Sequence, residues 1–213
     1  MNLIIIFFSG ILTGLSGSMI PGPLFLFTVS ESLKKDAKVG LKIAFGHIII
    51  EGLLIAFIFL GLKNFLQSTI FIKSISIIGA VALMGMGIIL MRKSPGMSLS
   101  VNKEVNFDYG VVSGGIFFSA ISPGFIIWWA TIGASVFLQA LLSGIVGFIV
   151  LALGHWLADF IWHWFISFSV NRGKQYLSDS LYQRIIQLLA LGLILMGVFF
   201  LIQFLYPSIN SRL

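Results

Sequence analysis

Gly46-His47-Ile48-Ile49-Ile50-Glu51 returns about a hundred residues later as Gly154-His155-Trp156-Leu157-Ala158-Asp159. In both copies a histidine stands four positions before a carboxylate, and both copies lie in strongly apolar stretches. An ionisable side chain at bilayer depth costs roughly 2.5–3.5 kcal/mol on insertion scales, so such residues mark a functional site by default. The two copies predict a membrane protein with an internal repeat whose function uses these four side chains.

The composition supports a membrane location. Of 213 residues, 58% are hydrophobic and 9% are charged, too few polar residues to cover a water-soluble surface. The absence of cysteine excludes disulfides, thiolate metal sites and cysteine nucleophiles. The net charge of +6 comes from lysines and arginines between the apolar segments, which form no basic face with interleaved aromatics, so nucleic acid is not an expected partner.

Six apolar segments approach the length of about 20 residues that a spanning helix needs. We expect an all-α integral membrane protein with helices at residues 3–29, 40–62, 70–91, 110–137, 141–168 and 185–206. Ten lysines and arginines fall after the first, third and fifth segments, and three fall on the other side. By the positive-inside rule, the first group is cytoplasmic and both termini are outside.

A polar linker at residues 92–109 divides the chain into a first three-helix repeat, 1–91, and a second, 110–213. An odd number of spans reverses the second repeat relative to the first, so the repeat is predicted to be inverted. Further matches fall in the same order in both halves. They pair Gly10-Ile11-Leu12-Thr13-Gly14 with Gly110-Val111-Val112-Ser113-Gly114, Pro21-Gly22 with Pro123-Gly124, and Leu83-Met84-Gly85 with Leu195-Met196-Gly197.

Proline next to glycine predicts that helices one and four are interrupted, at Pro21-Gly22-Pro23 and at Ser122-Pro123-Gly124. Broken helices in a membrane occur where they are buried in protein or line a wet cavity. Their exposed ends can hold a carboxylate and an ammonium, so we expect a substrate site there. The alternative is that these prolines only kink helices for packing. Trp128 and Trp129 follow the second break and are candidates to line the same pocket.

The His-acid pairs have three interpretations. Positions i and i+4 share a helix face, so His47 can approach Glu51, and His155 can approach Asp159. Histidine titrates near neutral pH, so the four groups could relay protons. Two imidazoles and two carboxylates could instead bind a divalent metal. In the third interpretation the pairs only neutralise each other and fix the helix register.

His163 lies in Ile161-Trp162-His163-Trp164-Phe165, near the expected end of helix five, so we interpret it as interfacial, with Trp162 and Trp164 in an aromatic belt. Glycines recur on helices three and six and are expected to serve close helix packing, which is also compatible with a homodimer. These glycines are Gly79, Gly85, Gly87, Gly192 and Gly197.

No P-loop, Gly-rich nucleotide turn or zinc-protease helix occurs, so the sequence predicts neither a nucleotide-driven pump nor an enzyme, and it implies no cofactor. A membrane enzyme would need a reactive group with a positioned partner, and the polar side chains offer little beyond the His-acid pairs. An assembly scaffold would not need those pairs at all.

The chain resembles the lysine exporter (LysE/RhtB) family over essentially its whole length. The resemblance is carried by Ser18-Met19-Ile20-Pro21-Gly22-Pro23, by the basic loop with Lys38-Val39-Gly40-Leu41, and by the broken fourth helix at Ser122-Pro123-Gly124. The family's usual Asn-Pro-Lys at that second break is absent here, which removes an amide and a cation from the implied site.

The resemblance implies a secondary transporter of the cell membrane that exports amino acids or related small metabolites in exchange for protons. The substrate would bind at the two breaks, and His47, Glu51, His155 and Asp159 would couple its movement to protons. The alternative is a divalent metal exporter that uses the same four residues as ligands.

Overall fold

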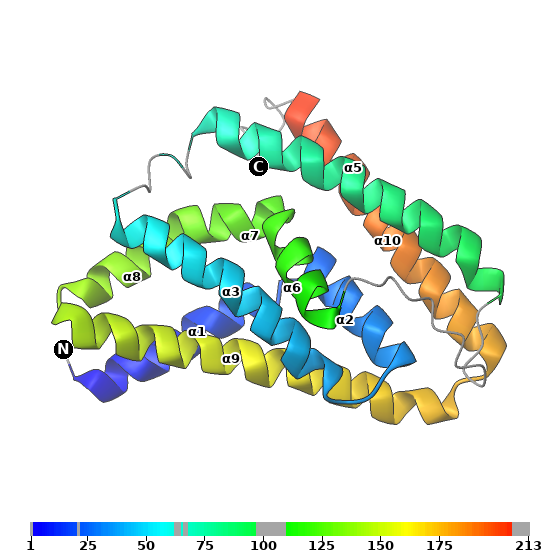
Figure 1. Ribbon diagram of the computed structural model, residues 1–213, viewed down its shortest axis with the longest axis horizontal. Helices are drawn as coiled ribbons and strands as arrows, with labels where there is room; N and C mark the ends of the chain where they lie inside the picture. The colour runs from blue at the N-terminus through cyan, green and yellow to red at the C-terminus, as the bar shows by residue number, and fades with distance from the viewer. Residues whose placement is uncertain (1, 21, 62–64, 66–67, 97–109, 206–213) are drawn as a thin grey trace.

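The computed structural model describes residues 2–20, 22–61, 65, 68–96 and 110–205 (Figure 1). Within these ranges all regular elements are helical, five are long and apolar enough to cross a membrane, and one bent pair makes a sixth span. This confirms the predicted all-α membrane protein. The elements are α1 Leu3–Ser18, α2 Pro23–Lys34, α3 Val39–Phe59, α5 Thr69–Lys93, η1 Ser94–Gly96, α6 Val111–Ala120, α7 Pro123–Trp128, η2 Trp129–Gly133, α8 Ala134–Leu141, α9 Gly144–Gly173, η3 Lys174–Tyr176 and α10 Asp179–Leu205.

Both predicted interruptions are confirmed. The first span stops at Ser18 and resumes at Pro23, and its two halves are bent by 81°. The other broken segment stops at Ala120 and resumes at Pro123, where the Ser122 hydroxyl caps the new helix by accepting from Phe125 N at 3.3 Å. Proline is the first residue of each new helix, a position that needs no backbone donor. Pro21 lies outside the described residues.

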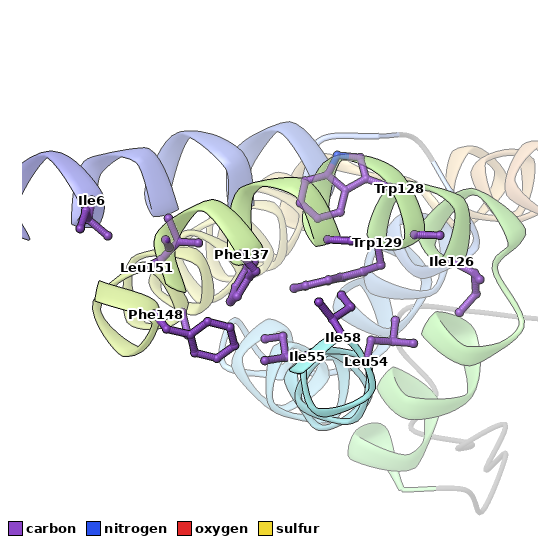
Figure 2. Close-up of a cluster of buried hydrophobic side chains, with 14 residues drawn as sticks. Ile6, Leu54, Ile55, Ile58, Ile126, Trp128, Trp129, Phe137, Phe148 and Leu151 are labelled. Carbon is purple, nitrogen blue, oxygen red and sulfur yellow. The ribbon is translucent and has the colours of Figure 1, made fainter. Parts of the chain in front are cut away.

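The segment after the second break has a further irregularity. Residues 129–133, directly after α7, form a π-helical turn, and α8 then continues to Leu141. Such turns disturb the regular α-helical hydrogen bonding and are frequent at functional sites. Trp129 begins the turn and is fully buried in an apolar cluster, where Figure 2 shows Ile58 and Phe137 beside it and Trp128 at the border.

Glycines bring helices of opposite halves into backbone contact. A Cβ atom on Gly10 would overlap Leu151 O, and one on Gly154 would overlap Phe7 O, so α1 and α9 touch closely. The same contact occurs between α3 and α6. There a Cβ on Gly46 would overlap Val112 O, and one on Gly115 would overlap Ile43 O.

These paired contacts give the predicted inverted repeat a different register from the sequence match. Gly115, rather than Gly110, has the contact that Gly10 has in the first half, because each faces the carbonyl four residues before the histidine of a His-acid pair. In the α5 and α10 pair, Gly87 and Gly197 are the close contacts. A Cβ on Gly85 would meet nothing within 4 Å, so the expectation that this glycine serves packing is wrong.

One end of the bundle gathers the turn 35–38, η1 and η3, and we call it the basic end because lysines and arginines cluster there (Figure 1). Two side chains at the close of α9 tie it together. Asn171 Nδ2 donates to Lys35 O at 2.8 Å, and Lys174 Nζ donates to the same oxygen at 2.5 Å. The three turns predicted to be cytoplasmic therefore share one side of the molecule.

We predict that Gly154→Val destabilises the protein by roughly 1–3 kcal/mol or more, because a side chain at this contact must push α1 away from α9. Thermal unfolding in detergent measures the effect as a lower melting temperature. Gly85→Val is the matched control, since its Cβ meets no neighbour within 4 Å. Equal losses of stability in the two variants would contradict the close α1–α9 contact.

Candidate functional site

Glu51 on α3 is the centre of a buried polar cluster. Its Oε1 atom lies 3.3 Å from His47 Nε2, 3.3 Å from His155 Nε2, and accepts from Trp129 Nε1 at 3.2 Å. The carboxylate is 2% exposed, so these contacts replace the water that it loses on burial. Three separate elements, α3, α9 and η2, thus meet on one oxygen.

Asp159 is the second buried carboxylate. The hydroxyl of Ser18, the last residue of α1, donates to Asp159 Oδ1, and Asp159 Oδ2 lies 3.9 Å from His155 Nε2. Asp159 Oδ2 and Glu51 Oε2 are buried without a hydrogen-bond partner among the described residues. Each acid therefore has one oxygen whose hydrogen bonds no described residue satisfies.

His47 is held between Ser119 of α6 and Glu51 of its own helix. Its Nδ1 atom lies 2.7 Å from the hydroxyl of Ser119, which also lies 2.7 Å from Gly115 O, and its Nε2 atom faces Glu51 Oε1. The tautomer of the imidazole sets which of these contacts it donates to.

The two breaks and the cluster line a single cavity of about 280 Å³. Of the residues predicted to bind substrate, Gly22, Pro23, Ser122, Gly124 and Trp128 line it, together with all four residues of the His-acid pairs. Pro123 is buried beside Gly79 and is absent from the described lining, and Pro21 lies outside the described residues. The side chains between these groups are mostly aromatic: Phe25, Phe118, Phe125, Trp129, Phe199 and Phe200.

The structure corrects the interpretation of His163. We expected helix five to end near residue 168, which would place this histidine at the interface, but α9 continues to Gly173. His163 is 3% exposed, lines the cavity and lies against the ring of His47, with 5.6 Å between the ring centroids. Its Nδ1 atom lies 2.9 Å from Asp159 O. Trp164, by contrast, is 42% exposed, as a belt residue should be.

Two serines of the site were not predicted from the sequence as site residues. Ser18 and Ser119 each precede a helix break and each contact the His-acid pair of the opposite half. Their position, at the last residue of α1 and the next-to-last residue of α6, is a signal that could have identified them, although serine is common in this chain.

The spacing of the cluster would also admit a cation. One ligand atom each from His47, Glu51 and Asp159 lie within 4.8 Å of one another. However, the Trp129 indole and the Ser18 hydroxyl already donate hydrogen bonds to the two carboxylates. These donors contact one oxygen of each acid, and the other oxygen of each has no hydrogen-bond partner among the described residues.

Comparison with known proteins gives one match. The family model described as LysE type translocator matches residues 15–204, which is most of the chain. No curated protein and no solved structure matches the sequence.

We predict that Trp129→Phe lowers the stability by about 1.5–3 kcal/mol, because the ring volume is largely kept while Glu51 loses a hydrogen-bond donor. The melting temperature in detergent measures this loss. Trp164→Phe is the control, because this indole is exposed toward the surroundings and its replacement should change little. Equal melting temperatures for Trp129→Phe and wild type would show that the indole does not stabilise the carboxylate.

Proposed function

The chain belongs to the LysE type translocator family, whose members are membrane exporters of amino acids or similar compounds, and we propose that it exports amino acids or related small metabolites by proton antiport. We place it in the cell membrane with the basic end in the cytoplasm and both termini outside, following the distribution of positive charge. A homodimer is compatible with this proposal.

The observation that carries the proposal is the shared cavity. It joins both helix breaks to both His-acid pairs, so substrate and protons would meet in one space. The N-terminus of α2 faces this cavity through Gly22, Pro23 and Leu24, and Gly22 provides no side-chain cap. Free backbone donors at such a terminus favour a carboxylate, while the oxygens of Glu51 and Asp159 that lack a hydrogen-bond partner favour an ammonium.

Charge balance supplies a mechanism of exchange. Glu51 and Asp159 carry two negative charges when ionised, and the three histidines of the cavity carry from zero to three positive charges. An ammonium group bound at the carboxylates would repel protons from the adjacent imidazoles. Proton uptake after release of the substrate would restore the cluster. Protons and substrate therefore compete for the same two acids, which is what antiport requires.

The serines before the breaks can link this exchange to a conformational change. Ser18 ends α1 immediately before the bend and donates to Asp159, so a movement at the first break alters the hydrogen bonding of that acid. Ser119 has the same relation to His47 at the second break. The state of the cluster and the geometry of both breaks are thereby coupled. Alternating access needs such a coupling between a midplane site and the repeats around it.

We predict that Glu51→Gln and Asp159→Asn each reduce gradient-driven efflux at least about a hundredfold, because each removes an acid on which substrate and protons compete. The assay is efflux from proteoliposomes loaded with a labelled amino-acid mixture, with and without an imposed proton gradient. Asp36→Asn is the matched control, since this exposed acid accepts from Lys38 N in the turn after α2.

A parallel set of vesicles holds divalent metal ions in place of the amino acids. Movement of metal without amino-acid flux would overturn the proposal in favour of metal export. Wild-type efflux by both Glu51→Gln and Asp159→Asn would show that these carboxylates have no role in transport.

We also predict that Gly124→Lys folds and shifts the preference of the transporter toward amino acids with a second carboxylate. A Cβ at this position meets nothing within 4 Å, and the residue lines the cavity, so the ammonium can enter it. Competition of unlabelled aspartate and leucine with the labelled mixture measures the shift. Gly173→Lys, at the C-terminal end of α9 with equally free space, is the control, and an unchanged preference in Gly124→Lys would contradict the predicted substrate position.

A further inference from the structure

His163 belongs to a row of polar side chains along α9. The row is made of His155, Asp159, His163, Ser167 and Asn171, which follow at intervals of four residues, so each lies about one turn beyond the last and the row winds slowly around the helix. The first four are at most 3% exposed. The row leads from the cluster to the basic end, where Asn171 Nδ2 donates to Lys35 O. Figure 1 shows α9 running along the bundle to that end.

The middle of the row lies under the start of α3. A Cβ on Gly40 would overlap His163 O and approach Ser167 Cβ to 2.7 Å, so backbone rather than a side chain covers these residues. The hydroxyl of Ser167 is buried without a hydrogen-bond partner among the described residues. A buried polar atom without a protein partner is commonly satisfied by an ordered water. The row therefore contains a hydroxyl whose hydrogen bond no described residue supplies.

The corresponding face of α3 has no such row. Four and eight residues after Glu51 stand Ile55, which is 7% exposed, and Phe59, which packs edge-on against Phe148 with 5.7 Å between centroids. If the halves are related as the paired glycines indicate, these apolar residues take the places of His163 and Ser167 and point toward the opposite end. The cluster thus has a buried polar connection toward the basic end, and its counterpart on α3 is apolar.

We propose that His163, Ser167 and Asn171, bridged by water, form the path by which protons pass between the His-acid cluster and the basic end. This proposal rests on the proposed proton antiport and adds the route that the protons take. His163 is placed to accept or deliver a proton, because its ring lies against His47 of α3 and next to Asp159 of its own helix. From Asp159 to Asn171 is twelve residues, about 18 Å of helix, so three side chains spaced about 6 Å apart need water between them.

The test separates proton movement from substrate movement. Proteoliposomes contain the pH dye pyranine and the labelled amino-acid mixture, and two rates are measured for each variant. Counterflow of labelled against unlabelled amino acids at equal pH needs the substrate site alone. Efflux driven by a proton gradient, with the dye reporting the protons, needs the path as well.

We expect His163→Gln to slow proton movement about a hundredfold and Ser167→Ala about tenfold. Ser167 is absent from the described cavity lining, so Ser167→Ala should keep counterflow within about twofold of wild type. Serine to alanine is the milder change because water can partly replace a hydroxyl. Ser169→Ala is the matched control, since Ser169 is two residues away on the exposed face of α9 and should leave both rates unchanged.

Three outcomes would overturn the path. Wild-type proton rates in His163→Gln and Ser167→Ala would refute it while leaving proton antiport intact. A parallel loss of counterflow and proton movement in Ser167→Ala would assign the row to substrate binding or folding. A wild-type protein that moves amino acids without protons would refute the proposed coupling itself, and the path with it.

Discussion

Two carboxylates must be buried in a bundle that faces lipid, and much of the architecture serves to satisfy them. Glu51 and Asp159 are nearly inaccessible, and each receives a hydroxyl or indole donor in addition to histidine contacts. The hydroxyl and indole donors come from the half of the chain opposite to the acid that they contact. The helices must therefore approach closely, which the glycine contacts permit. Burial of an unpaired charge in such a place would cost several kcal/mol.

The interrupted helices also contribute to the burial of the two carboxylates, through the course of the backbone. A continuous helix could not turn between Ser18 and Pro23. The cavity lined by Glu51 and Asp159 lies at this turn. The serines that precede the breaks then tie the backbone to the cluster. The buried polar cluster and the two helix breaks are consequently one structural unit, so a change in one alters the other.

The sequence was sufficient to predict the helical membrane fold, both breaks and the residues of the His-acid pairs, because charge and proline are rare and costly in apolar segments. Predictions from the sequence were wrong where they rested on residue types that are common in this chain or on the apparent end of an apolar segment. Glycine is so frequent that Gly110 could be matched to Gly10 in place of Gly115. The end of α9 was placed too early because Asn171 and Arg172 are polar, although a helix can extend past the membrane, and His163 was assigned to the interface as a result. Ser18 and Ser119 acquire their roles only through contacts across the two halves.

The contact between His47 and Glu51 lies within a single helix, four residues apart. When a ribosome delivers this chain to the membrane, α3 emerges long before Trp129 and His155 have been synthesised. At that stage Glu51 has one ionisable neighbour, which is His47 one turn away on the same helix. The same holds for Asp159, which emerges after His155 on the same helix. Each segment therefore carries a polar partner for its own acid through insertion, and the inter-helix contacts add to that pair once translation is complete.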